Sequence, residues 1–251
     1  MSDPVAGLVA DPAGAGRRQQ LADALEVVHA RIAAACGDAG RDPSEVTLTV
    51  VTKFFPASDV RLLAGLGVRH VGENRHQEAE AKAADCADLD LIWHYIGGLQ
   101  TNKAAAVASY AGVVESVDRP KLLRGLSRGA QEADRVLDVL VQVNLDPPGT
   151  AGTAGSGRAG VEPDAARALA EQVAATEGLR LRGVMAVAPR GEDPVPAFAE
   201  LTRVAAVVRA VDPSATWVSA GMSGDLEAGI RSGATHVRIG SAVLGQRPTG
   251  G

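Results

Sequence analysis

The sequence predicts a single (β/α)8 barrel, and three observations support this. Short β-branched runs recur along the 251 residues, each followed by an alanine-rich stretch with helical spacing. There are eight such runs, the number that closes a parallel sheet into a barrel. Helix-start signals such as Pro56, Pro120 and Pro163 follow the polar ends of several runs. An open doubly wound sheet is the alternative, but it needs a glycine-rich turn after its first strand, and VTKFFPA (51–57) is not one.

The predicted elements begin with a helix that precedes the barrel. It spans 17–36, where the apolar residues Leu21, Leu25, Val28 and Ile32 recur at helical spacing. The eight strands are expected at Val46–Phe54, Val68–Gly72, Leu91–Ile96, Val113–Val117, Val136–Val143, Leu181–Val187, Thr216–Ser219 and Thr235–Ile239. The fold class is therefore a TIM barrel with an extra N-terminal helix.

Composition and charge limit the possible functions. The net charge is −5, acids and bases are interspersed, and no basic run indicates a nucleic-acid partner. No apolar stretch approaches the roughly 20 residues of a membrane span. Residues 1–16 lack the basic start and apolar core of a signal peptide, so we expect a flexible leader, a barrel domain over 17–251 and a cytoplasmic protein. Cys36 and Cys86 lack metal-ligand spacing, which predicts buried thiols and no metal site.

One segment breaks the alternation of strands and helices. Residues 146–160 (DPPGTAGTAGSGRAG) follow the fifth predicted strand and show no apolar period. We expect a mobile loop at the C-terminal face of the barrel, where loops often bear function. A long, tolerated insertion is the alternative interpretation.

Lys53, one of only four lysines, stands in the apolar run VVTKFFP (50–56). Strand alternation places it on the barrel-facing side, at the C-terminal end where barrel active sites lie. The residues expected to share this side are Thr47, Thr49, Val51 and Phe55, whereas Leu48, Val50, Thr52 and Phe54 are expected to face the helices. Apolar surroundings lower the pKa of a lysine, and a neutral amine can form a Schiff base with a carbonyl. Alternatively, the side chain snorkels to the rim.

Two turns near the end of the chain predict a phosphate site. Residues 219–225 (SAGMSGD) and 237–242 (VRIGSA) follow the seventh and eighth strands, where barrels commonly bind phosphate. Small residues let the backbone approach an anion, and N–H groups at helix starts point towards it. A lysine that can form an imine and a phosphate site in one barrel mouth predict a ligand with both an aldehyde and a phosphate. Pyridoxal 5′-phosphate is such a ligand.

Arg238 lies on the last predicted strand. Alternation turns His236, Arg238 and Gly240 into the barrel, and Val237 and Ile239 outward. A guanidinium inside a barrel needs a partner. It could donate a hydrogen bond to the ring nitrogen of the cofactor and keep that nitrogen unprotonated, or it could pair with an acid in the barrel.

Seven sequence motifs, in order between Arg17 and Arg247, resemble one family. They are VTKFFP (51–56), VGENRHQE (71–78), WHYIGGLQTNK (93–103), ESVDR (115–119), RGVMAVAP (182–189), VSAGMSGDLEAGI (218–230) and VRIGSAVLG (237–245). In this arrangement the chain is similar to the YggS/PROSC family of pyridoxal phosphate homeostasis proteins.

The resemblance implies a fold and a set of site residues. The fold would be the alanine racemase barrel, pyridoxal phosphate fold type III, without that enzyme's C-terminal β-domain. Lys53 would carry the cofactor as a Schiff base, and Arg238 would face the pyridine nitrogen. The remaining implied residues are Ser223, Gly240 and Ser241 at the phosphate, and Asn74 and Met222 along the pocket.

The chain departs from the family pattern in two places. Gly98 stands where a bulky or polar residue is frequent, so the pocket wall there differs. The loop after the fifth strand is long and reads Arg158-Ala159-Gly160-Val161 where relatives often carry a lysine. A second, lysine-based cofactor contact in this loop is therefore in question, because arginine does not form an imine under ordinary conditions.

Three functions are considered. The resemblance implies a protein that buffers pyridoxal phosphate and delivers it to dependent apoenzymes, without established turnover, and we expect it to be a monomer. The alternative is a racemase or related enzyme, which needs a second base. The chain ends about ten residues after its eighth strand, so we expect no second domain to supply that base, and Tyr95 is expected in the core or pocket wall. A Schiff-base aldolase would explain Lys53 and the phosphate turns, but it explains Arg238 less well.

The other histidines and lysines are interpreted more simply. His29, His70 and His76 are expected at the surface or in packing, and His94 could support the pocket from behind. The remaining lysines, Lys82, Lys103 and Lys121, lie in helical stretches and are expected to be solvated.

Overall fold

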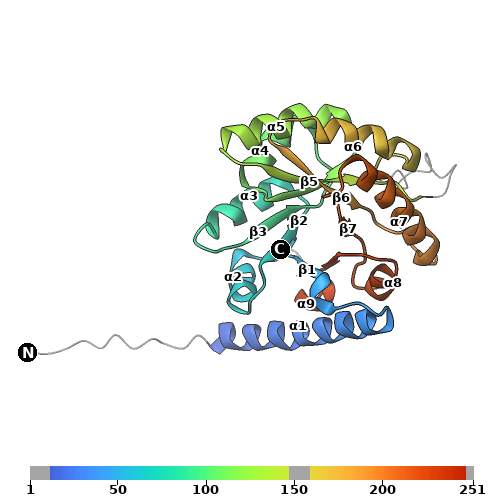
Figure 1. The fold of residues 1–251 in the computed structure, drawn as a ribbon. Helices are drawn as coiled ribbons and strands as arrows, with labels where there is room; N and C mark the ends of the chain where they lie inside the picture. Colours follow the sequence, from blue (N-terminus) through green and yellow to red (C-terminus); the bar gives the residue numbers. More distant parts are fainter. Residues whose placement is uncertain (1–11, 147–158, 247–251) are drawn as a thin grey trace, which may run out of the picture.

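Eight parallel strands close into a barrel, as the sequence predicts (Figure 1). The structure is a computed structural model that describes residues 12–146 and 159–246. The strands pair in chain order and the eighth returns to the first. They are β1 Thr47–Val51, β2 His70–Glu73, β3 Ile92–Tyr95, β4 Val113–Val117, β5 Leu137–Gln142, β6 Leu179–Met185, β7 Trp217–Ser219 and β8 His236–Ile239. All eight predicted strands are confirmed, although most are shorter than predicted.

The helices surround the barrel in chain order (Figure 1). Within the described residues they are α1 Pro12–Asp38, α2 Ala57–Gly65, α3 His76–Asp85, α4 Ala104–Tyr110, α5 Leu123–Glu132, α6 Ala166–Ala174, α7 Pro194–Val211, α8 Leu226–Arg231 and α9 Ser241–Leu244. Short 3-10 helices lie at Pro43–Glu45, Thr101–Lys103, Pro120–Leu122 and Pro163–Ala165. None of the described helices is long and apolar enough to span a bilayer.

The predicted leader and loop fall largely outside the described residues. Helix α1 begins at Pro12, so the last residues of the segment 1–16 are helical, whereas 1–11 are not described. Of the predicted loop over 146–160, residues 147–158 are not described. The expectation of mobility for both segments stays a prediction.

Helix α1 packs against the part of the barrel where β1 meets β8. Its four predicted apolar residues, Leu21, Leu25, Val28 and Ile32, are all buried. They belong to one apolar cluster with Val50 of β1 and with Val237 and Ile239 of β8. Each such side chain contributes about 1.5–3 kcal/mol when it is fully buried. The extra helix is therefore part of the hydrophobic core.

Helix α1 also holds the loops that follow β7 and β8. Arg31 pairs with Glu227 of α8 at 2.8 Å and donates to the backbone carbonyl of Ser223 at 3.1 Å. Arg17 donates to the backbone carbonyl of Leu244, the last residue of α9, at 3.0 Å. These contacts fasten, from outside the barrel, the two turns in which the sequence predicts a phosphate site.

Candidate functional site

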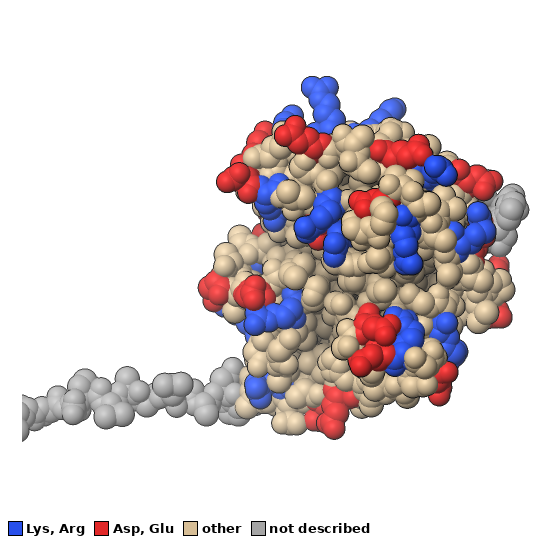
Figure 2. Space-filling view, in the orientation of Figure 1, with Lys and Arg blue, Asp and Glu red and all other residues tan. Residues whose placement is uncertain are grey.

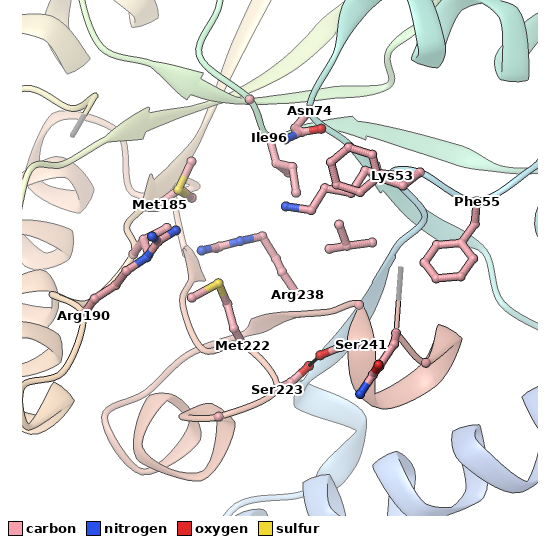
Figure 3. Close-up of a pocket in the computed structure, with 18 of the residues that line it drawn as sticks. Lys53, Phe55, Asn74, Ile96, Met185, Arg190, Met222, Ser223, Arg238 and Ser241 are labelled. Carbon is pink, nitrogen blue, oxygen red and sulfur yellow. Dashed lines mark hydrogen bonds between the residues drawn. The ribbon is translucent and has the colours of Figure 1, made fainter. Parts of the chain in front are cut away.

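A cavity of about 520 Å³ opens at the carboxyl ends of the strands (Figure 3). All seven residues predicted for the site line it: Lys53, Asn74, Met222, Ser223, Arg238, Gly240 and Ser241. Sequence reasoning did not include several others that also line it, among them Phe54, Ile96, Gln142, Met185 and Arg190. Barrel closure thus brings segments from both ends of the chain to one cavity.

Lys53 lies just beyond β1, in the turn that leads to α2, and its side chain extends into the cavity (Figure 3). The next residue, Phe54, has a φ of 72°, in the left-handed region that non-glycine residues seldom adopt. This turn ends the strand alternation. Phe54 lines the cavity instead of facing the helices, so that prediction was wrong, and Phe55 packs in the cluster beneath α1 while also bordering the cavity.

A buried amine holds the lysine-bearing turn from behind. Lys82 of α3 donates to the carbonyl of Thr52 at 2.8 Å and to the carboxylates of Glu73 and Glu78, each at 2.7 Å. Glu78 in turn accepts the backbone N–H of Phe54 at 2.6 Å, and the hydroxyl of Thr52 donates to Glu73 at 2.6 Å. Both residues that flank Lys53 are therefore tied to this cluster.

The prediction that Lys82 is solvated was wrong, because its side chain is only 8% exposed. The spacing of Glu78 and Lys82, four residues apart on one helix, was the available signal for an ion pair. Nothing in that spacing shows that Glu73 would join them in the interior. Burial raises the pKa of Glu73, and the hydrogen bond from Lys82 opposes that shift.

The two turns in which the sequence predicts a phosphate site, 219–225 and 237–242, lie side by side at the cavity edge. The hydroxyls of Ser223 and Ser241 lie 3.4 Å apart, and the backbone N–H of Ala242 points to the Ser223 oxygen at the same distance. Gly240 packs so tightly against β1 that a Cβ there would lie 3.3 Å from the carbonyl oxygen of Val51. The small residues let the two turns and the end of β1 converge on one place.

Arg238 forms part of the cavity floor and is itself buried, with 4% exposure. Its guanidinium donates to the hydroxyl of Ser219 at 2.6 Å and to the carbonyl of Ala186 at 2.8 Å. The carboxylate of Glu115 lies 3.7 Å from the same guanidinium. An acid in the barrel therefore accompanies Arg238, as one interpretation of the sequence has it, and the contact of Arg238 with a cofactor ring stays a prediction.

Glu115 belongs to a hydrogen-bonded row inside the barrel that sequence reasoning missed. Its carboxylate accepts from Ser219 at 2.6 Å and lies 2.7 Å from Nδ1 of His94, whose Nε2 is 2.9 Å from Nδ1 of His70. Burial alone would raise the pKa of Glu115, but the hydrogen bond from His94 and the nearby guanidinium of Arg238 lower it to about 2. Glu115 is therefore ionised at neutral pH, and His94 lies behind the pocket as predicted.

The ionisable side chains along the cavity are all basic. Among the described lining residues they are Lys53, Arg190 and Arg238. Tyr95 is buried in the core, as predicted, and Tyr110 is half-buried; neither lines the cavity. Burial raises the pKa of Tyr110 above its usual value. A site of this composition suits an anionic ligand. Among the described lining residues, the amine of Lys53 is the group that can condense with a carbonyl.

Comparison with known proteins defines the class of this barrel. Residues 45–248 match the model of the alanine racemase N-terminal domain. Structures of alanine racemase itself share only the fold: that of Corynebacterium glutamicum gives a TM-score of 0.63 at 15% identity over 93% of this chain and 63% of that chain. The protein is thus a barrel of the alanine racemase N-terminal type.

The chain belongs to the family of pyridoxal phosphate homeostasis proteins. It is 41% identical to the protein of that name from Mycobacterium tuberculosis, over 92% of this chain and 94% of the relative. The relative from Pseudomonas aeruginosa is 39% identical over 92% and 97%. The structure of PipY from Synechococcus elongatus with pyridoxal phosphate bound matches with a TM-score of 0.76 at 33% identity, over 90% of this chain and all of that one.

Replacing Lys82 with methionine should destabilise the protein. Lys82→Met leaves the carboxylate of Glu73 buried without its cation, and loss of one partner of a buried ion pair costs about 3–5 kcal/mol. Urea unfolding of the purified variant measures this loss. The matched control is Lys121→Met, the same change at an exposed lysine, with an expected effect within about 0.5 kcal/mol. Equal stabilities for the two variants would contradict the structural role of Lys82.

His236 makes the stability of the barrel depend on pH. Burial lowers its pKa from 6.5 to about 3, so the unfolded chain binds a proton near pH 6.5 that the folded chain does not yet bind. Stability therefore falls as the pH drops from 6.5 towards 3. Between pH 7 and 4.5, His236→Asn should lose about 2–3 kcal/mol less than the unchanged protein. Urea unfolding at both pH values checks this, and parallel losses in the two proteins would refute it.

Proposed function

We propose that this protein binds pyridoxal 5′-phosphate as a Schiff base on Lys53 and takes part in holding and delivering the cofactor in the cell. The observation that supports this most directly is the convergence of Lys53, Arg238 and the turns of Ser223 and Ser241 on one cavity. The ionisable lining residues that the structure describes there are all basic. The bound cofactor of the PipY structure and the names of the relatives point in the same direction.

The residues present fit the cofactor. The hydroxyls of Ser223 and Ser241, beside the compact Gly240 backbone, offer donors for the phosphate. Arg238 keeps N–H groups for the ring nitrogen beyond those it gives to Ser219 and Ala186. Asn74 lines the same cavity and carries a side-chain amide, which can donate and accept hydrogen bonds. When bound, the cofactor supplies an aldehyde that condenses with an amine and a ring that absorbs visible light.

Binding fits the geometry better than turnover. Racemisation needs acid–base groups on both faces of the substrate α-carbon. The described part of the cavity offers Lys53 but no carboxylate, imidazole or phenol, and an arginine is not deprotonated in proteins. A monomer that works in the cytoplasm and passes the cofactor to dependent apoenzymes is the form of this proposal that follows from the sequence.

Lys53→Ala should abolish the colour of the cofactor-loaded protein. After incubation with pyridoxal phosphate and desalting, the unchanged protein should be yellow, because the Lys53 amine and the aldehyde condense to an imine with loss of water. Borohydride reduces the imine, and mass spectrometry should then place the adduct on Lys53. Lys121→Ala, at an exposed lysine, should behave like the unchanged protein. An adduct on another residue, or none, would refute the Schiff base on Lys53, and a protein that stays colourless would favour the aldolase.

The loaded protein should racemise amino acids slowly or not at all. The reason is that no second base stands opposite Lys53 in the described cavity. Incubation with single enantiomers of common amino acids, followed by chiral chromatography, measures the rate. Free pyridoxal phosphate at equal concentration is the control. Sustained racemisation well above that control, and lost in Lys53→Ala, would establish an enzyme in place of a carrier.

A further inference from the structure

The cavity floor is connected to a carboxylate that does not touch the cavity. Glu115 is 1% exposed and does not line the cavity, yet its carboxylate lies in the barrel directly behind Arg238. Two contacts join them: the shared hydroxyl of Ser219, and a direct approach of 3.7 Å between Nη1 of Arg238 and Oε2 of Glu115. A buried guanidinium and a buried carboxylate this close compensate each other's charge.

Every hydrogen bond in this row has one consistent direction. An ionised carboxylate only accepts, so Ser219 donates to Glu115 and its oxygen remains to accept from Arg238. For the same reason His94 donates to Glu115 through Nδ1, which leaves its Nε2 to accept from Nδ1 of His70. A Gln side chain at this position could not accept both hydrogen bonds in the same way. Its amide has one oxygen, so its NH2 group would face one of the two donors, Ser219 or His94.

The row restricts the orientation of Arg238. Its Nη1 is held by Ser219, and its Nη2 is held by the backbone carbonyl of Ala186. The planar fork of a guanidinium is fixed once two of its nitrogens are bound. The remaining N–H groups then keep one direction relative to the cavity. Ser219 donates its hydroxyl hydrogen to Glu115, and this fixes the direction in which its oxygen accepts from Arg238.

We infer that Glu115 is a positioning residue, which orients Arg238 through Ser219 and offsets its charge beneath the ring of the bound ligand. The inference rests on the proposed function for the identity of that ligand, a pyridoxal-type aldehyde held on Lys53. With Glu115 ionised, Arg238 and Glu115 together present little net charge to the ligand. Without that carboxylate, the floor of the cavity gains a full positive charge.

The two parts of this role lead to separate effects. A positive charge near an imine disfavours its protonated form, so loss of the Glu115 charge should lower the pKa of the imine on Lys53. Loss of the Ser219 hydroxyl leaves both charges in place and removes the hydrogen bond that orients Arg238. Glu115→Gln thus tests the charge, and Ser219→Ala tests the orientation.

The colour of the loaded protein reports the charge effect. In spectrophotometric pH titrations, Glu115→Gln should lower the pKa of the imine by roughly one unit. Ser219→Ala should keep the imine pKa within about 0.3 units and weaken cofactor binding about tenfold, the loss of one charge-assisted hydrogen bond. Unshifted titrations of Glu115→Gln would overturn the inference and leave the proposed function intact. A colourless unchanged protein would refute the proposed function, and the orientation of Arg238 would then be tested on the cofactor-free protein.

The cofactor-free protein reports the orientation directly. In NMR spectra of guanidinium N–H groups, Arg238 should give slowly exchanging signals, assigned by their loss in Arg238→Lys, and these should broaden or vanish in Glu115→Gln and Ser219→Ala. The control is Thr49→Val, because Thr49 is buried opposite Arg238 in the sheet register and its hydroxyl has no partner among the described residues. Unchanged Arg238 signals in both test variants, or equal loss in the control, would overturn the inference.

Discussion

The pairing of β1 with β8 is the constraint on which the site depends. Thr49 lies opposite Arg238 and Val50 opposite Ile239, so the first and last strands of the barrel end side by side. Lys53 and the Gly240–Ser241 turn, which are far apart in the sequence, consequently meet at one edge of the cavity. Gly240 allows the close approach, since a side chain there would press on the backbone of β1. One ligand in this cavity could therefore make both contacts of the proposal, an imine with Lys53 and a phosphate contact at the Gly240–Ser241 turn.

Two helices stabilise the two halves of the site from outside the barrel. Arginine side chains of helix α1 donate to the carbonyls of Ser223 and Leu244, near the turns in which a phosphate site is predicted. Helix α3 binds both flanks of Lys53, because Lys82 donates to the carbonyl of Thr52 and Glu78 accepts the N–H of Phe54. The left-handed backbone at Phe54 is unfavourable on its own, and the hydrogen bond from its N–H to Glu78 helps to hold it. The amine of Lys53 therefore projects from a turn that is hydrogen-bonded on both sides.

Periodicity and position were enough to predict the barrel and the place of its cavity. Strand runs and their polar ends are local signals, and barrel geometry then fixes which ends meet. The errors arise where tertiary structure decides. Lys82 has the pattern of an exposed helical residue, and only the approach of Glu73 from β2 makes its burial favourable. Phe54 follows the strand alternation in sequence, but the strand ends at Val51, three residues earlier than predicted.

Glu115 shows why buried polar residues are hard to interpret from sequence and informative in a structure. It stands in the apolar strand VVESV, where an unpaired carboxylate would be very costly. Its partners Ser219, His94 and Arg238 come from three other strands, so no local sequence pattern indicates that they contact Glu115. The outward sides of the strands carry the apolar packing against the helices, whereas the inward sides carry this polar row. Substitutions outside the barrel should therefore act mainly on stability, and those inside should alter the charge that the cavity offers to its ligand.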